Sequence, residues 1–272
     1  MTDKTGKGNA KVLSLKGTVK STIDLPKVFE TEYRPDVIQK ASVAEASQER
    51  QSYGTNDRAG LNTTAEYYSR RKGVYRMTMN RGMSRLPRLK IPGGGLGRVA
   101  QVPQSRGGRR AHPPKAEKDF SKKINNKEYL LAIKSAIAAT SDGELVKGEG
   151  RNHKIGDISI PLIVEKAFAG IDKTTKVIEV LEKLGLKDEL ERAEDKKTRT
   201  GKAKARRGRK KQKTSVLIVV GDECKLQKSA GNLPGVDVST VDDLNVNLLA
   251  PGGYPGRMTI WLEDSFEKLN EI

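Results

Sequence analysis

The sequence contains only one cysteine, Cys224, among its 272 residues. A disulfide within the chain is therefore excluded, and the cysteine content gives no sign of an oxidising compartment. Histidine is nearly as rare: His112 and His153 are the only two, and neither has a cysteine, histidine or carboxylate at the spacing of a metal site. Because no serine-centred nucleophile motif is present either, the sequence predicts no metal centre and no catalytic residue.

Long apolar runs are also missing. The N-terminal residues MTDKTGKGNAK lack the apolar core of a signal peptide. No run anywhere in the chain reaches about 20 apolar residues, the length that crosses a bilayer. We therefore expect a soluble, cytoplasmic protein that needs no cofactor.

Acidic residues are absent from a fifty-residue stretch, Tyr67 to Ala116, which contains thirteen Lys or Arg. Ordering it costs about 75 kcal/mol, at roughly 1.5 kcal/mol for each residue, and its scattered apolar side chains cannot offset this cost. Its eight glycines and five prolines oppose a long helix or a central strand. We predict extended, irregular backbone that a partner outside the chain must order.

A second stretch without acids, Lys196 to Lys213, holds eleven more Lys or Arg. The rest of the chain has 28 Lys and Arg against all 34 acids, so the net charge of +18 comes wholly from these two stretches. Clustered cations release counterions from nucleic-acid phosphates, which favours RNA as the partner. An anionic membrane is the alternative, but neither stretch has the pattern of an amphipathic helix. Taken alone, the second stretch is equally typical of a disordered basic tail.

The fold class is predicted from Ser215 to Val220, whose sequence SVLIVV is typical of a strand covered on both faces. Strands and helices alternate along the chain, which indicates an α/β layered sandwich with a mainly parallel sheet. A long irregular loop is inserted between two of the helices. The other predicted strands cover residues 11–15, 22–25, 158–164, 236–239 and 258–262. The predicted helices cover residues 35–50, 125–140, 173–184, 187–194, 226–230 and 263–269, with a helical turn at 242–245.

Local signals refine some of these elements. Asn125 and Glu128 have the spacing of a capping box, and Asp172 is the expected N-cap of the helix that Gly185 ends. Pro161 places the strand around it either at its own start or at an edge of the sheet. The apolar face of the helix that begins near Asn125 is expected to contain Leu130, Ile133 and Ile137.

The chain is predicted to have one α/β domain, residues 11–50 and 117–272, after a mobile N-terminus, residues 1–10. Residues 51–116 form the extended RNA-penetrating loop, and residues 196–213 form a basic RNA-binding segment within the globular part. Fifty residues that leave and re-enter one domain reach at most about 80 Å. The loop is therefore long enough to extend beyond its own domain.

Two further patterns suggest chemistry but have simpler interpretations. The glycine run at residues 93–97 lacks the Lys-Ser/Thr of a phosphate-binding loop, so we interpret it as flexible backbone. Asp222 and Glu223 follow a strand, where α/β enzymes bind ligands, but acids there usually cap the next helix. Asp242 and Asp243 are interpreted in the same way, as residues at a helix N-terminus. An RNA-modifying or nucleotide-dependent enzyme remains the alternative function.

Six motifs are specific in combination: FETEYRPDVI from Phe29, YGTNDRAGL from Tyr53, VPQSRGGRRAHPPKAEKDFSKKINNKE from Val102, AIAAT ending at Thr140, NLPGVDV from Asn232 and LNVNLLAPGGYPGRMTIW from Leu244. With these motifs the sequence closely resembles the universal large-subunit ribosomal protein L-four family in its archaeal and eukaryotic form, from about Val12 to the C-terminus. The HPPK block and the second basic stretch favour the archaeal type over the bacterial one. The chain departs from the family at Asn62 and Gly231, where the family usually has Arg.

This resemblance implies a structural, non-enzymatic protein of the large ribosomal subunit that binds ribosomal RNA. Its long loop would help to line the polypeptide exit tunnel, so the implied partners are ribosomal RNA, neighbouring large-subunit proteins and the nascent polypeptide, with no membrane and no homo-oligomer. Bacterial relatives also repress their own messenger RNA, which is a further alternative. By position, Arg70 to Arg98 would approach the loop tip and residues 106–115 would form its RNA-packed stem.

The predicted RNA-binding residues come from both basic stretches. Arginine predominates in the first, which suits planar, bidentate contacts with phosphate and stacking on bases. The predicted residues are Arg70, Arg71, Lys72, Arg76, Arg81, Arg85, Arg88, Lys90, Arg98, Arg106, Arg109, Arg110, His112, Lys115, Lys202, Lys204, Arg206, Arg207, Arg209, Lys210 and Lys211.

Overall fold

A computed structural model describes residues 8–68, 77–78, 80–148, 153–156 and 158–270 of the chain. These residues form two compact units, each of which is considered by itself. Unit 1 comprises Met1–Glu49 and Ser121–Ile272, and unit 2 comprises Arg50–Phe120.

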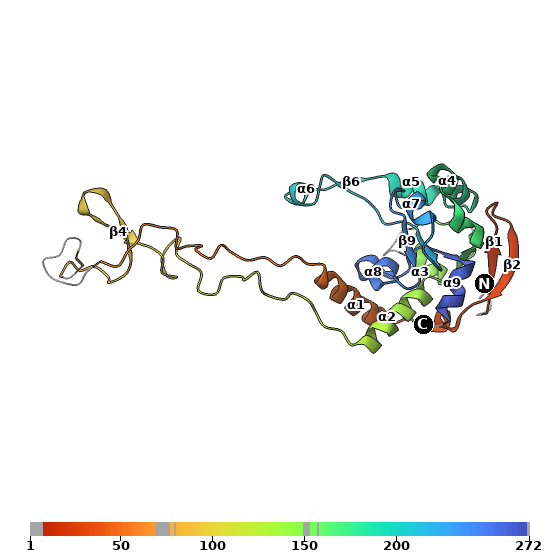
Figure 1. Ribbon diagram of the computed structural model, residues 1–272, viewed down its shortest axis with the longest axis horizontal. Helices are drawn as coiled ribbons and strands as arrows, with labels where there is room; N and C mark the ends of the chain where they lie inside the picture. The colour runs from red at the N-terminus through yellow and green to blue at the C-terminus, as the bar shows by residue number, and fades with distance from the viewer. Residues whose placement is uncertain (1–7, 69–76, 79, 149–152, 157, 271–272) are drawn as a thin grey trace. The chain divides into compact units, whose positions relative to one another are not determined.

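Unit 1 is built around a six-stranded sheet with the order β2-β1-β5-β10-β8-β9 in its described residues (Figure 1). β1 and β2 are antiparallel, and the other neighbouring strands are parallel. The prediction of an α/β fold with a mainly parallel sheet is therefore confirmed. The strands are β1 (Asn9–Leu13), β2 (Val19–Asp24), β5 (Leu162–Val164), β8 (Leu217–Val220), β9 (Asp237–Thr240) and β10 (Thr259–Leu262).

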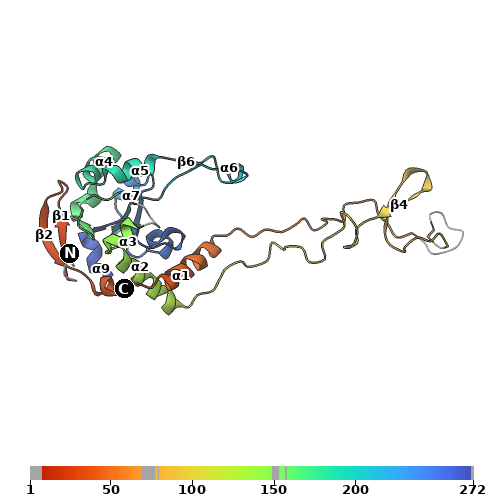
Figure 2. The ribbon, with the colours of Figure 1, turned by 180° about the vertical axis from the view of Figure 1, so that it is seen from behind.

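Helices cover both faces of this sheet, as Figures 1 and 2 show from opposite sides. One face carries α1 (Pro35–Gln48), α2 (Asn126–Ala139), α8 (Val246–Leu249) and α9 (Glu263–Leu269). The other face carries α3 (Gly143–Lys147), α4 (Thr174–Lys183), α5 (Lys187–Glu194) and α7 (Leu226–Ala230).

Two apolar cores result, because successive side chains of a strand point to opposite faces. In β10, Trp261 packs into the core under α1 and α2, whereas Ile260 and Leu262 pack into the other. Phe29 meets the edge of Trp261 with ring centroids 5.5 Å apart. The unbroken apolar sequence of β8 and β10 thus follows from burial on both faces, as the sequence predicted for Ser215 to Val220.

Several helix predictions are confirmed. α1 begins at Pro35, and α5, α7 and α9 have the predicted bounds. α4 ends as expected, because Gly185 has a φ of +86° that other residues rarely adopt. Its N–H donates to the carbonyl oxygen of Glu182, and that of Leu186 donates to Leu181, which closes the last turn.

Other expectations about the ends of elements are wrong. The N-cap of α4 is Lys173 and not Asp172, whose carboxylate instead pairs with Lys225. The strand β1 begins at Asn9, within the segment expected to be mobile, because pairing with β2 buries Ala10. Residues 1–7 of that segment lie outside the described residues.

The expectation for Pro161 is met by the first of its two alternatives: β5 starts directly after it, in the interior of the sheet between β1 and β10. Two further expectations about the helices are wrong. Leu130 is 48% exposed, since α2 buries its alanine-rich side instead. The helical turn predicted at 242–245 is displaced to α8, because the Asn245 side chain accepts a hydrogen bond from the Leu248 N–H and caps the helix there. The helix α3 was not predicted.

Unit 2 contains a hairpin that contradicts the prediction of wholly irregular backbone. β3 (Arg88–Lys90) pairs antiparallel with β4 (Leu96–Val99) around the short helical turn Pro92–Gly94. The glycine run supplies this turn, with a φ of +80° at Gly93 and +84° at Gly94. A Cβ on Gly97 would lie 2.7 Å from the carbonyl oxygen of Leu89, so the strands approach closely only because Cβ is absent.

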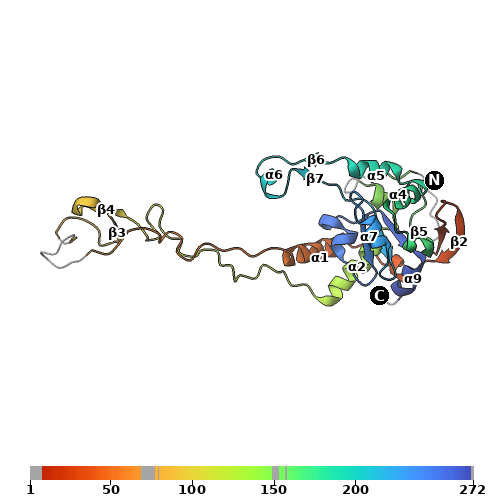
Figure 3. The same ribbon diagram turned by 45° about the horizontal axis from the view of Figure 1, so that its top comes forward.

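The second basic stretch is an ordered hairpin within unit 1, which contradicts the alternative of a disordered tail. β6 (Lys197–Thr198) pairs with β7 (Lys210–Lys211), and α6 (Ala203–Arg206) lies between them in the sequence. Figure 3 shows the two strands side by side with α6 at the end of the hairpin. We call residues 197–211 the basic hairpin.

Across the described part of the chain, no helix combines the length and the apolar composition that crossing a membrane requires.

Candidate nucleic-acid interface

The two arms of unit 2, residues 50–61 and 101–120, run against each other and form what we call the stem. The Thr55 N–H donates to the carbonyl oxygen of Pro114 at 3.2 Å. A Cβ on Gly54 would lie 2.7 Å from the backbone nitrogen of Ala116, and one on Gly60 would lie 2.5 Å from the backbone nitrogen of Arg109. Glycine at these two positions therefore allows the backbones of the arms to touch.

The stem holds five of the predicted RNA-binding residues. All five side chains are exposed, and they follow one another along a single arm. Four of them are Lys or Arg, and because closely spaced cations repel one another, a polyanion that lies along this arm gains from each of these four. The five are Arg106, Arg109, Arg110, His112 and Lys115.

The predicted residues around the β3–β4 hairpin fall into two groups. Arg81, Arg85, Lys90 and Arg98 are exposed, and the Lys90 ammonium pairs with Glu66. Arg88 differs, because it is only 9% exposed. The predicted residues Arg70, Arg71, Lys72 and Arg76 lie outside the described residues.

The guanidinium of Arg88 is used inside the hairpin. It donates to the carbonyl oxygen of Gly97 at 3.3 Å and to the hydroxyl of Ser84 at 2.8 Å. These bonds tie the two strands together, so the side chain supports the hairpin and does not face a partner. Arg88 is among the predicted RNA-binding residues because the sequence pattern does not distinguish a buried arginine from the exposed arginines beside it.

The basic hairpin has a similar internal arginine. Nη1 of Arg199 donates to the carbonyl oxygens of Arg207 at 2.7 Å, Gly208 at 3.2 Å and Lys210 at 2.6 Å. One side chain thereby satisfies three backbone acceptors and holds the turn closed. Sequence reasoning did not single out Arg199, because only the fold distinguishes it from the other cations.

The other cations of the basic hairpin point to solvent. Seven predicted residues are exposed, and β6 and β7 hold them at fixed spacings. An ordered hairpin loses less conformational entropy on binding than a disordered tail does, which favours tighter association. The seven are Lys202, Lys204, Arg206, Arg207, Arg209, Lys210 and Lys211.

Three of the acids that could suggest an enzyme, Asp222, Asp242 and Asp243, take part in ion pairs or hydrogen bonds with other side chains. Asp222 does not cap α7, whose N-cap is Lys225. Instead the Lys268 ammonium donates to Asp222 at 2.6 Å, and this hydrogen bond lowers the pKa of that carboxyl. Lys268 also lies 3.5 Å from Asp242, while Asp243 accepts a hydrogen bond from the Thr240 hydroxyl. Since α8 begins only at Val246, the prediction that Asp242 and Asp243 lie at a helix N-terminus is wrong.

No group of three or more metal-ligating side chains occurs among the residues that the structure describes. Cys224 is half-buried and packs against the core under α4 and α7. The features that remain are two basic surfaces, the stem with its neighbouring hairpin and the basic hairpin of unit 1. Such an arrangement favours binding to phosphates.

Comparisons with known proteins agree with an RNA-binding role, because the matched family and relatives are named as ribosomal proteins. Residues 23–272 match the model of the family described as "Ribosomal protein L4/L1 family". The chain is 44% identical to the "Large ribosomal subunit protein uL4" of Methanocaldococcus jannaschii over 263 residues, which is 96% of this chain and 98% of that protein. It is 45% identical to the protein of the same name from Methanococcoides burtonii, over 96% of this chain and 97% of that protein.

A third relative of that name, from Archaeoglobus fulgidus, is 44% identical over 96% of this chain and 98% of its own length. All three are archaeal, which confirms the predicted type. The chain therefore belongs to the ribosomal protein L4/L1 family, whose members are non-enzymatic ribosomal proteins.

Proposed function

We propose that this protein is a structural component of the large ribosomal subunit that binds ribosomal RNA through the stem and the basic hairpin. The observation that carries the proposal is the exposure of the cations on these two ordered surfaces, in a chain whose residues outside the stretches 67–116 and 196–213 are net acidic. The relatives named as large-subunit proteins support the assignment to that subunit.

The proposal extends to the part of unit 2 between the two arms of the stem. This part contacts RNA through its exposed arginines and helps to line the polypeptide exit tunnel, where the nascent chain and neighbouring large-subunit proteins are its further partners. The resemblance to the L-four family and the length of the segment support this role. Small and flexible residues such as the glycines of the β3–β4 turn allow close approach to crowded RNA strands.

Reconstitution of large subunits tests the proposal. Arg109→Glu places a negative charge on the exposed arm of the stem, so we expect the variant to enter subunits poorly, because the new carboxylate repels phosphate. The matched control is Glu267→Lys, a charge reversal at an exposed position of α9, which we expect to leave assembly unchanged. Sucrose-gradient sedimentation of the assembled particles measures both. Equal incorporation of the two variants would contradict the proposal.

A further inference from the structure

Aromatic and cationic side chains from both arms gather at the base of the stem. The rings of Tyr53 and Phe120 stack with centroids 5.4 Å apart and planes inclined by 12°. The Arg50 guanidinium carbon lies 4.4 Å from the centroid of Phe120, and the Lys118 ammonium lies 5.6 Å from it. Cations over ring faces are attracted by the negative face of the π-system, so these four residues form one cluster.

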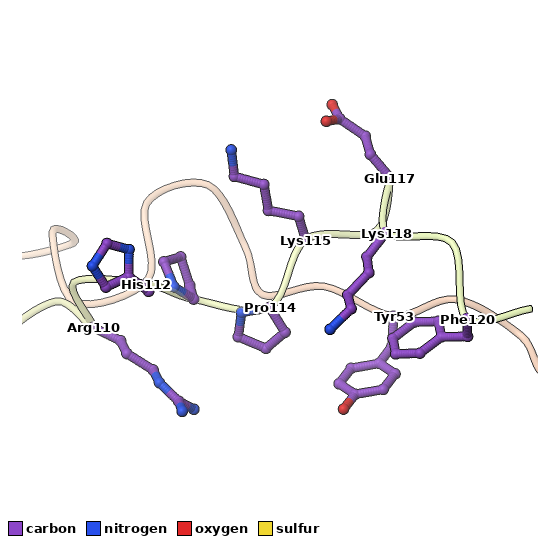
Figure 4. A pocket seen from close by; sticks show the side chains of 9 residues that line it. Tyr53, Arg110, His112, Pro114, Lys115, Glu117, Lys118 and Phe120 are labelled. Atoms are coloured by element: carbon purple, nitrogen blue, oxygen red, sulfur yellow. The ribbon is translucent and has the colours of Figure 1, made fainter. Parts of the chain in front are cut away.

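The cluster borders a cavity of about 550 Å³. This volume lies within the range of small-ligand pockets, about 300–1,000 Å³. Arg110, His112 and Pro114 also line this cavity, beside Tyr53, Lys118 and Phe120 of the cluster. In Figure 4, Arg110, Lys118 and Tyr53 extend to one side of the backbone, whereas Lys115 and Glu117 point to the opposite side. The acid is thus directed away from the side on which the ring and two cations lie.

The exposure of Tyr53 indicates that the cluster does more than hold the arms together. Tyr53 is 54% exposed although its ring is stacked on Phe120. A side chain that served only as a clamp gains most when it is buried, since the stabilisation grows with the apolar area removed from water. Phosphate contacts alone do not account for the ring either, because an aromatic face offers nothing to an anion. An exposed ring beside two cations suits a planar base with phosphates on either side of it.

We propose that this cavity binds one unpaired nucleobase of RNA, stacked on Tyr53, with Arg110 and Lys118 contacting the flanking phosphates. The base must be unpaired, because in a duplex its faces are covered by its neighbours. Every base has a π-face, so the stack tolerates any base and selects a single-stranded or bulged nucleotide over a helix. The inference rests on the proposed function and specifies which form of RNA this site takes.

Fluorescence of the full-length chain tests the proposal. Tyr53→Trp places a reporter in the cavity, and Tyr254→Trp places one at a 63% exposed tyrosine of unit 1, outside both basic surfaces, as the matched control. The native Trp261 is 0% exposed and gives a constant background in both. The probes are an oligoadenylate of about ten nucleotides and an abasic ribose-phosphate chain of the same length and charge, both labelled so that anisotropy reports binding.

We expect oligoadenylate to quench the reporter at position 53 by about half, and the abasic chain to bind without quenching it. Tyr53→Leu is expected to weaken oligoadenylate binding about 10-fold at this site, with no change for the abasic chain and none in Tyr254→Leu. If both probes bind and the emission at position 53 is unchanged, or if position 254 is quenched equally, the stacking site is disproved and the proposed function stands. If neither probe binds, the proposed function fails together with the inference.

Discussion

The imidazole of His153 and the carboxylate of Glu189 form a buried hydrogen bond across 36 residues of sequence, with Nδ1 and Oε1 2.7 Å apart. Their side chains are 1% and 0% exposed. Nε2 of His153 accepts from the Met258 N–H at 3.3 Å, so Nδ1 carries the proton and donates to Glu189. The carboxylate also accepts from Arg192 at 2.6 Å and from the Ser215 hydroxyl at 2.9 Å. Glu189 thus joins α5 to the segments that lead into β8 and β10.

The first prediction concerns Glu189→Gln, which removes the charge at the centre of this network. We expect the free energy of unfolding of the full chain to fall by about 3 kcal/mol, because the Arg192 charge loses its buried partner. Urea denaturation followed by circular dichroism measures the loss. Glu194→Gln at an exposed position of the same helix is the control, with an expected change within about 0.5 kcal/mol. Similar midpoints for the two variants would show that the network does not stabilise unit 1.

The second prediction is that the folded protein loses stability in acid, because the pKa of Glu189 is lowered in the folded state. Burial alone would raise the pKa of Glu189, but hydrogen bonds from Arg192 and His153 outweigh it and lower the pKa from 4.5 to about 2. The lowered pKa contributes stability that is fully present above pH 4.5 and is lost as the pH falls towards about 2. The wild type should therefore lose about 3 kcal/mol more than Glu189→Gln across this window. Unfolding curves taken at half-unit pH intervals test this, and parallel pH profiles would contradict it.

The third prediction is that unit 1 folds without unit 2. α1 and α2 pack against each other beside the insertion, and the Lys122 N–H donates to the Ser47 hydroxyl at 2.8 Å. The ends of the insertion are therefore close, and a Gly/Ser linker of about eight residues, which spans up to about 25 Å, can replace residues 50–120. We expect cooperative thermal unfolding with native-like near-ultraviolet circular dichroism. If the shortened protein shows neither a cooperative unfolding transition nor a native-like near-ultraviolet spectrum, unit 1 depends on unit 2 for its folding.

Arg199→Lys tests whether the basic hairpin acts through its order or only through its charge. The substitution keeps the positive charge, but an ammonium cannot reproduce the geometry of a guanidinium that donates to three carbonyl oxygens. We expect faster amide exchange in residues 197–211 and roughly 5-fold weaker binding to large-subunit RNA. Arg206→Lys, at an exposed position of α6, is the matched control and should alter neither quantity. Unchanged affinity of Arg199→Lys would mean that charge alone is sufficient.

Binding to large-subunit RNA should depend steeply on salt. Each neutralised phosphate adds about 0.7 to 0.9 to the slope of log affinity against log salt concentration. Many exposed cations of the stem and the basic hairpin should each neutralise a phosphate. We therefore expect the slope of log affinity against log salt concentration to exceed about 5 in magnitude. Filter binding between 50 and 400 mM KCl, roughly the range in which such slopes are measured, provides the test. A slope near one would contradict extensive phosphate contact.

The sheet and most of its helices could be predicted because each leaves a local signal. Ser215 to Val220 is apolar without alternation, and this is the pattern that burial under helices on both faces requires. Gly185 marks the end of α4 because the left-handed backbone there favours glycine. Helix starts were harder to predict. Asp172, the expected N-cap of α4, pairs with the distant Lys225 instead, and the local sequence gives no sign of that contact.

The features that sequence reasoning missed depend on contacts between distant residues. The spacing of His153 and Glu189 in the sequence does not indicate their hydrogen bond, because the bond forms only when the segment that contains His153 folds against α5. The β3–β4 hairpin could have been found, because polar and apolar residues alternate at 88–91 directly before a Pro-Gly turn. Its high content of arginine hid this signal. Arg88 and Arg199 are likewise indistinguishable in sequence from cations that face solvent.

The hydrogen bond between Lys122 and Ser47 fixes the two ends of the insertion at the same place on unit 1. The entropy lost in closing a flexible chain grows only with the logarithm of its length, so doubling the insertion costs about 0.6 kcal/mol. Evolution can therefore lengthen or shorten this segment with little effect on the sheet and its cores. Under the proposed function, the reach of this segment into RNA would then be limited by the RNA around it and not by the stability of unit 1.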